Sequence, residues 1–279
     1  MTASSIANIN VASTTIAGDL IAEPTEEFTG TVSINNASGQ QYVIDTPTAT
    51  STITDNDVIT INLAGLTVTE TSATQTQNFV ASMNHPAQAD IILSFSTSDG
   101  NALDGNDYTA QTATVVTIPH GSTSVNIPVS ILGDLITEPQ EAFTATITLT
   151  NANSQQASVG TFTATGTIND DDPATFAITG FTANEDAGTT SFTITLSKSV
   201  QNAFTVDFAT SSITAIAGSD YTEVTTTTLN FGSTNPLTHT ITVTINDDDL
   251  VEPTETLRGT LSNLVANSQA VTIPTPTAT

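Results

Sequence analysis

The sequence contains no cysteine and no tryptophan, and only two of its 279 residues are lysine or arginine. Without cysteine, the chain can form neither disulfides nor thiolate metal sites. Without a basic surface, it has nothing to set against the phosphates of a nucleic acid or the headgroups of an acidic membrane. No apolar run approaches the roughly 20 residues of a membrane-spanning helix. The sequence therefore predicts no nucleic-acid partner and no direct insertion into a membrane.

Acidic residues dominate the charged positions. Aspartate and glutamate number 28, and the formal net charge is −26. Acidic chains poor in aromatic residues are often disordered, but segments 29–34, 144–149 and 191–196 alternate apolar residues with threonine or serine. This period of two is typical of strands with one buried face. We therefore expect an ordered all-β chain, whose acidic residues either keep it soluble or collect cations.

One acidic segment occurs three times. It runs from Gly18 to Phe28, from Gly133 to Phe143 and from Asp247 to Leu257, and each copy contains Glu-Pro-x-Glu. The first glutamates of the three copies are 115 and 114 residues apart. A period of this length indicates tandem domains. The register divides the chain into the second half of a module (1–57), a complete module (58–172) and a module lacking its last strand (173–279).

The strand pattern indicates the fold of each module. About seven short strands with turns every 8–12 residues are typical of an immunoglobulin-like antiparallel β-sandwich. The Cys–Trp–Cys pattern of true immunoglobulin domains is absent. No flexible linker separates the modules, so we expect the sandwiches to form an elongated rod. In the complete module, strands are predicted near 58–63, 66–69, 77–83, 90–96, 112–118, 123–131, 142–150 and 161–168.

Four acidic groups recur in register. In the complete module they are Glu70, Asp107, the loop with Asp134, Glu138 and Glu141, and the closing run 170–172. The third module repeats them at 185–186, at 220, and at 247–249 with two following glutamates. The half-module has only the loop and the closing run. Most isolated acidic residues form turns or keep a protein soluble. The repetition of these residues in register instead favours a shared site.

The order of these motifs resembles the Calx-beta family, the calcium-binding sandwich of sodium–calcium exchangers and many bacterial surface proteins. The matching elements are Gly-x-Asp-Tyr at 105–108, the turn Pro119-His120-Gly121, Asp-x-x-x-Glu-Pro-x-Glu-x-Phe from Asp134, and the closing aspartates. The resemblance covers nearly the whole chain and implies Ca²⁺ at one end of each module. The implied ligands are Asp19, Glu23, Asp55, Asp57, Glu70, Asp107, Asp134, Glu138, Asp170, Asp171, Asp172, Glu185, Asp220, Asp247, Asp248 and Glu252.

Electrostatics favours a cation among these residues. Two carboxylates about 4 Å apart repel by roughly 1 kcal/mol in water and by more near a protein surface. Ca²⁺ accepts 6–8 oxygen ligands in irregular geometry, whereas Mg²⁺ requires near-octahedral geometry and zinc prefers nitrogen and sulfur. The first two copies of the loop open with Gly-Asp, where the third has Asp-Asp. We therefore expect fewer or weaker ions at the first two loops.

The resemblance implies a structural role outside the cell. We expect a stalk or filament segment of a calcium-binding adhesin at the cell surface, with Ca²⁺ stiffening the module ends and joints. One alternative is a filament subunit that joins other copies head to tail by strand complementation. Another is a glycan-binding accessory module, although only 5% of the residues are aromatic. The expected partners are neighbouring modules or copies of the same protein, and no repeated catalytic arrangement suggests an enzyme.

Overall fold

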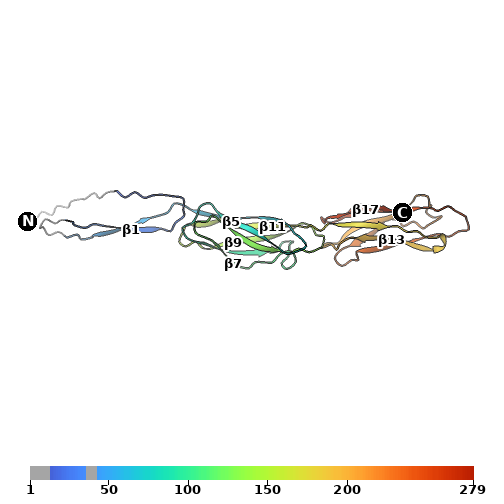
Figure 1. Ribbon diagram of the computed structural model, residues 1–279, viewed down its shortest axis with the longest axis horizontal. Helices are drawn as coiled ribbons and strands as arrows, with labels where there is room; N and C mark the ends of the chain where they lie inside the picture. Colours follow the sequence, from blue (N-terminus) through green and yellow to red (C-terminus); the bar gives the residue numbers. More distant parts are fainter. Residues whose placement is uncertain (1–12, 36–42) are drawn as a thin grey trace, which may run out of the picture.

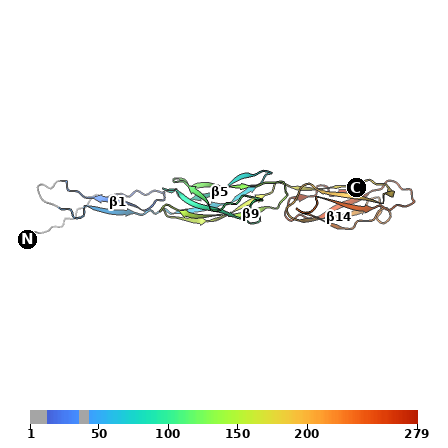
Figure 2. The same cartoon turned by 90° about the horizontal axis from the view of Figure 1, so that it is seen from below.

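A computed structural model describes residues 13–35 and 43–279 as three consecutive β units. We call them the half-module (1–57), module two (58–172) and module three (173–279). In Figures 1 and 2 they follow one another in chain order along the longest axis. The one helical element in the described ranges is the short 3₁₀ turn η1 (Glu185–Ala187), and no helix there could cross a membrane. The predicted all-β fold is confirmed.

The half-module contains one pair of strands in its described part. β1 (Glu26–Thr31) pairs antiparallel with β2 (Thr48–Ile53), with Phe28 opposite Ser51. Nearly every side chain of the two strands is exposed, including Phe28. Within the described residues of the half-module, no second sheet covers the apolar face of this strand pair.

Module two is a sandwich of two sheets, visible at the centre of Figure 1. The first sheet has the strand order β10-β3-β5-β8 and the second has the order β4-β11-β9-β6-β7. The strands are β3 (Ile59–Ala64), β4 (Leu66–Thr69), β5 (Gln75–Met83), β6 (Ile91–Ser98), β7 (Thr114–Ile118), β8 (Ser124–Ile131), β9 (Glu141–Asn151), β10 (Ala157–Thr161) and β11 (Thr163–Asn169).

Each of the eight strands expected in module two has a counterpart here. The prediction missed β10, and it missed two parallel pairings at the sheet edges, β10 with β3 and β11 with β4. All other pairings in the module are antiparallel. The parallel pairs arise because the end of the module returns beside its start.

The apolar side of each strand of module two faces the space between the sheets. Burial alternates along β9, whose Phe143, Ala145 and Ile147 are buried. The Phe143 ring packs edge-on against Phe79 at 5.8 Å and stacks on Tyr108 at 4.0 Å between centroids. Such aromatic pairs contribute beyond the area that they bury. This aromatic packing lies directly beneath the acidic end of the module.

Module three repeats the sandwich with the sheet orders β16-β13-β12-β18 and β15-β14-β17-β19. Its core includes Phe192, Phe208 and Phe231. At the end of module three, β19 pairs with β17 as the start of β11 pairs with β9 in module two. The strands are β12 (Ala174–Thr179), β13 (Thr189–Leu196), β14 (Phe204–Ser212), β15 (Thr227–Phe231), β16 (Thr238–Thr244), β17 (Leu257–Val265), β18 (Val271–Thr272) and β19 (Thr277–Ala278).

Candidate metal centre

The Gly-x-Asp-Tyr loop is a tight turn that fixes its aspartate at the end of the sandwich. Gly105 has a φ of 83°, in the left-handed region that glycine adopts at no steric cost. Asp107 Oδ2 accepts a hydrogen bond from the Leu103 N–H at 2.6 Å. Tyr108 is fully buried, and its hydroxyl donates to Asp99 Oδ1 at 2.7 Å. The buried tyrosine thus anchors the position of Asp107.

The acidic loop opens in all three units with the same local turn. Asp134 Oδ1 accepts from the N–H of Ile136 at 2.6 Å, two residues further on. Asp19 and Asp248 make the equivalent bonds at 2.8 and 2.6 Å. Aspartate commonly forms such turns with the following backbone. One oxygen of each of these aspartates is therefore engaged in shaping the loop that carries the glutamates.

In module two, the loop brings two glutamates onto Asp107. Carboxylate oxygens of Asp107, Glu138 and Glu141 all lie within 4.8 Å of one another. The three residues are only 5%, 9% and 4% exposed. Glu141 Oε2 is buried and has no hydrogen-bond partner. Burying an unsatisfied charged oxygen is costly, so this arrangement calls for a positive ligand.

Burial and mutual repulsion shift the pKa values of these glutamates strongly. Burial, followed by the charges of Glu141 and Asp107, raises the pKa of Glu138 to about 8. Burial likewise raises the pKa of Glu141 to about 7. Glu70 joins the same environment, because burial and then Asp134 and Asp170 raise its pKa to about 8. The structure thus gathers carboxylates from four separate segments at one end of module two.

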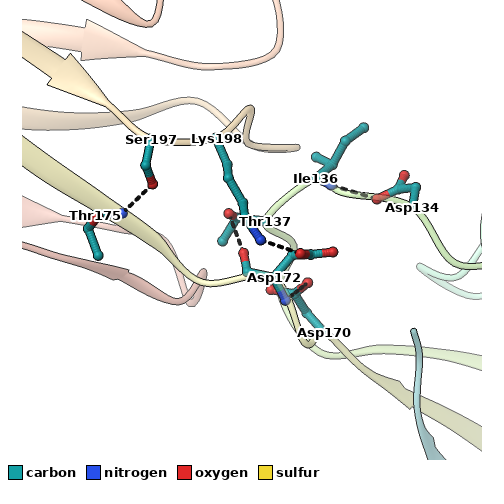
Figure 3. Close-up of polar contacts among 8 residues, drawn as sticks. All are labelled: Asp134, Ile136, Thr137, Asp170, Asp172, Thr175, Ser197 and Lys198. Carbon is teal, nitrogen blue, oxygen red and sulfur yellow. Dashed lines mark hydrogen bonds and ion pairs between the residues drawn. The ribbon is translucent and has the colours of Figure 1, made fainter. Parts of the chain in front are cut away.

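The three closing aspartates, all predicted as ligands, occupy different environments. Asp170 Oδ1 accepts from the Asp172 N–H at 3.0 Å, whereas Asp170 Oδ2 is buried without a partner. Asp171 is exposed. Asp172 forms an ion pair with Lys198 of module three, and its carbonyl accepts from Thr137 Oγ1 at 2.6 Å (Figure 3). Asp170 therefore faces the acidic group, while Asp172 is engaged in the joint.

Module three has a similar but more open group. Carboxylate oxygens of Asp220, Glu252 and Glu255 lie within 4.8 Å of one another. Burial and the charges of Asp220, Asp248 and Glu185 raise the pKa of Glu252. A cavity of about 450 Å³ lies at this end of the module, and Glu185 and the three grouped residues line it. Asp247 does not line this cavity and is not part of the group.

The half-module gathers its own acidic residues. Asp55 Oδ2 accepts from the Glu23 N–H at 2.8 Å, and Asp55 Oδ1 accepts from the Asp57 N–H at 3.1 Å. Burial, followed by the charges of Glu26, Asp19, Asp55 and Asp57, raises the pKa of Glu23. All four predicted ligands of this unit therefore lie near one another.

The predicted ligand set left out one position of the loop in every unit. This is the second glutamate of Glu-Pro-x-Glu, which is Glu26, Glu141 and Glu255. In modules two and three it belongs to the three-carboxylate group. Its recurrence in all three copies was a usable signal in the sequence.

The residues of module two fit Ca²⁺. They offer only oxygen atoms, from Glu70, Asp107, Glu138, Glu141 and Asp170. Oxygen ligands in this number suit a hard cation of high coordination number, whereas zinc would require nitrogen or sulfur ligands. One buried oxygen of Glu141 and one of Asp170 have no hydrogen-bond partner, and a bound cation would satisfy both.

Comparison with known proteins identifies the modules. Residues 5–57, 54–172 and 173–279 each match the Calx-beta domain. The chain belongs to the Calx-beta domain family. This family is an all-β fold with binding and structural roles and no catalytic one. No match was found among curated proteins.

Several solved structures resemble this Calx-beta chain. CBD12 from CALX1.2 has 19% identity, a TM-score of 0.36, and a match over 74% of this chain and 80% of its own. The apo form of the Calx CBD1 domain has 18% identity, a TM-score of 0.36, and a match over 42% of this chain and 100% of its own. A tetra-tandem repeat from the extending region of a large adhesion protein has 14% identity and a TM-score of 0.39, covering 78% of this chain and 50% of its own.

Proposed function

We propose that this chain is a stalk segment of an extracellular adhesin or filament at the cell surface, in which Ca²⁺ binds at the module ends and stiffens the joints. The supporting observation is the group of Asp107, Glu138 and Glu141, with its partnerless Glu141 oxygen. The stalk role and the location outside the cell come from the family resemblance. The calcium role comes from the site as well.

The calcium ion would neutralise charges that the fold places together. Glu70, Asp107, Glu138, Glu141 and Asp170 are the residues of module two that would hold it. In the absence of a cation, burial and the neighbouring carboxylates raise the pKa values of these glutamates, so the glutamates hold protons more readily. A bound Ca²⁺ would replace these protons and hold the loop in one conformation.

The same loop forms the joint between modules two and three. The Thr137 N–H donates to the Ser199 carbonyl at 2.9 Å, and the Gln201 N–H donates to the Thr137 carbonyl at 3.0 Å. At the first joint, the Ala22 N–H donates to the Pro86 carbonyl and the Gln88 N–H to the Ala22 carbonyl, both at 2.9 Å. Because Thr137 directly precedes Glu138, an ion that orders the glutamate also orders the joint.

Thermal unfolding in Ca²⁺ and in chelator tests the proposal. Calcium at about 100 times its dissociation constant would stabilise the folded state by about 2.7 kcal/mol. We therefore expect module two to melt markedly lower in chelator than in millimolar Ca²⁺. An unchanged melting temperature would remove the metal from the proposed function.

A double variant serves as the control for site-specific binding. Asp134→Ala with Glu138→Ala removes a loop former and a ligand but no core side chain. This variant should fold and should lose the difference between Ca²⁺ and chelator. A retained difference would place the ion elsewhere.

Small-angle X-ray scattering of the wild type should also show a stiffer chain in Ca²⁺ than in chelator.

A further inference from the structure

A glutamine side chain from the following module reaches the acidic loop at both joints. Gln201 Nε2 lies 3.0 Å from Glu138 Oε1 and 2.9 Å from Glu141 Oε1. At the first joint, Gln88 Nε2 lies 3.0 Å from Glu23 Oε1 and 3.4 Å from a Glu26 oxygen. The contact therefore occurs twice, on the same two positions of the Glu-Pro-x-Glu motif.

The joint holds each glutamine in place through its backbone. Thr137 and Val200 form a parallel bridge, and the Gln201 N–H donates to the Thr137 carbonyl. Val200 is fully buried. The backbone of Gln201 thus cannot leave the acidic group unless the joint opens.

The amide can serve the group in two ways. In the contacts described above, the amide nitrogen of Gln201 donates hydrogen bonds to two carboxylates, an arrangement that is favourable when no cation is bound. A half-turn about the last side-chain bond exchanges the nitrogen and the oxygen, because the two ends of the amide have nearly the same shape. Glutamine carbonyl oxygens are among the ligands of Ca²⁺. The half-turn would therefore present a neutral oxygen ligand to an ion among the three carboxylates.

We propose that Gln201, and Gln88 at the first joint, is a calcium ligand supplied by the following module. Each ion would then be held by two modules, and its affinity would depend on a closed joint. The proposal rests on the calcium binding proposed above. It also rests on Glu141, which is 4% exposed and whose second oxygen lacks a partner beside this glutamine.

Module three provides an internal contrast. Its group of Asp220, Glu252 and Glu255 receives no glutamine side chain from the ranges that the structure describes. Glu252 is exposed, and Glu255 is half-buried. The proposal therefore predicts weaker binding at this group than at the group of module two in the same chain, which reverses the order expected from the Gly-Asp and Asp-Asp openings of the loops.

Terbium luminescence sensitised by tyrosine can report on the module two site alone. The chain has no tryptophan and three tyrosines, of which Tyr108 adjoins Asp107. Replacing the other two, Tyr42→Phe and Tyr221→Phe, leaves Tyr108 as the only tyrosine. Tb³⁺ titration of the full chain, followed by displacement with Ca²⁺, then gives the affinity of this site.

The decisive variants are Gln201→Met and Gln201→Glu in that background. Methionine keeps the length of the side chain without the oxygen, and we expect it to weaken Ca²⁺ binding by about tenfold or more. Glutamate restores an oxygen and should bind at least as tightly as the wild type. Gln88→Met, at the other joint, is the matched control and should leave the Tyr108 signal unchanged.

The outcomes separate this proposal from the proposed function. If Gln201 only donates hydrogen bonds to the empty site, Gln201→Met will bind Ca²⁺ equally or more tightly, and the ligand proposal is overturned while calcium binding stands. If the parent background binds no Ca²⁺ at all, both are overturned. Should Gln201→Met fold poorly by circular dichroism, Gln201→Asn, whose amide is one methylene shorter, takes its place with the same expected weakening.

Discussion

The acidic ends of modules two and three carry the same motif in different surroundings. In module two, Glu138 and Glu141 are 9% and 4% exposed, and Gln201 of module three contacts both of them. In module three, the corresponding Glu252 is exposed and the corresponding Glu255 is half-buried. The same repeated motif therefore gives module two a buried site with raised glutamate pKa values and an oxygen without a hydrogen-bond partner. In module three it gives an open acidic cavity.

The packing beneath the two groups also differs. Tyr108 stacks on Phe143 in module two, whereas Leu257 occupies the position of Phe143 in module three. Tyr221 is nevertheless fully buried, and its hydroxyl lies 3.3 Å from the Ser212 hydroxyl. The acidic group of module two is therefore more deeply buried than that of module three, and the packing beneath it is more aromatic. Both features can be tested by making one end resemble the other.

Removing the Phe143 ring beneath the acidic group should have the largest effect on the stability of module two. Phe143→Ala deletes a ring that contacts Phe79 and Tyr108, and truncations of this kind cost about 3–5 kcal/mol. Urea denaturation of the full chain should show module two unfolding earlier while module three is unchanged. Phe143→Leu, which copies module three, should cost less. An equal cost for both variants would contradict this expectation, because leucine keeps most of the apolar volume that alanine removes.

Removing one buried charge should have opposite effects with and without calcium. In chelator at pH 8, Glu141→Gln relieves repulsion from Asp107 and Glu138 and should stabilise module two by between about 1 and 4 kcal/mol. In Ca²⁺ it loses a ligand and should destabilise the module. Glu255→Gln is the matched variant at the open end and should have the smaller effect. Calorimetric melting measures the change in stability for both variants. Equal changes would contradict the conclusion that the deeper burial of Glu141 strengthens its interactions with the neighbouring carboxylates.

The raised pKa values predict how the stability of calcium-free module two depends on pH. Folded Glu70 and Glu138 have pKa values of about 8, against 4.5 for the free side chain. Between these values the folded state holds more protons than the unfolded state, so stability is greatest below about pH 4.5 and is lost as the pH rises to about 8.

Melting of calcium-stripped protein between pH 5 and 8 would show this loss. Saturating Ca²⁺ should reduce the loss, because the ion takes the place of the protons. Glu70→Gln with Glu138→Gln should also flatten the curve. A melting temperature of module two that rises with pH in the stripped protein would contradict the burial of these carboxyl groups.

Breaking the ion pair at the second joint should have the smallest effect. Lys198→Met removes the partner of Asp172, whose side chain is 7% exposed, but the lysine itself is 34% exposed. We expect a loss of about 1 kcal/mol, at the upper end for pairs that water reaches. A double-mutant cycle with Asp172→Asn would isolate the pair. Lys198→His copies His85, the corresponding residue of the first joint, and should lose part of the same energy.

Much of the fold could be predicted from local patterns. The alternation at 66–69 and 123–131 matches β4 and β8 within a residue, since period-two burial is written directly into the side chains. β10 was missed because Ala157–Thr161 is short, contains glycine and pairs in parallel with a strand about a hundred residues earlier. Only the closure of the sandwich makes that segment a strand.

The candidate site was predictable in its composition more than in its roles. The family resemblance implied that Asp107 and Glu138 belong to one site, and the three-carboxylate geometry contains both. The separate roles of Asp170 and Asp172 were not visible, because they depend on a lysine that module three supplies. The glutamines of the two joints carried no signal by themselves, since nothing local marks a single Gln88 or Gln201.

By itself, the sequence determined the all-β character, the repeat, the charge and the aspartate turns, because strand alternation and a bond to the second residue along the chain are local properties. The tertiary structure alone decided which carboxylates are buried and what stands beside them. Desolvation depends on every atom that excludes water from a group, and at Glu138 and Glu141 those atoms include residues from the following module.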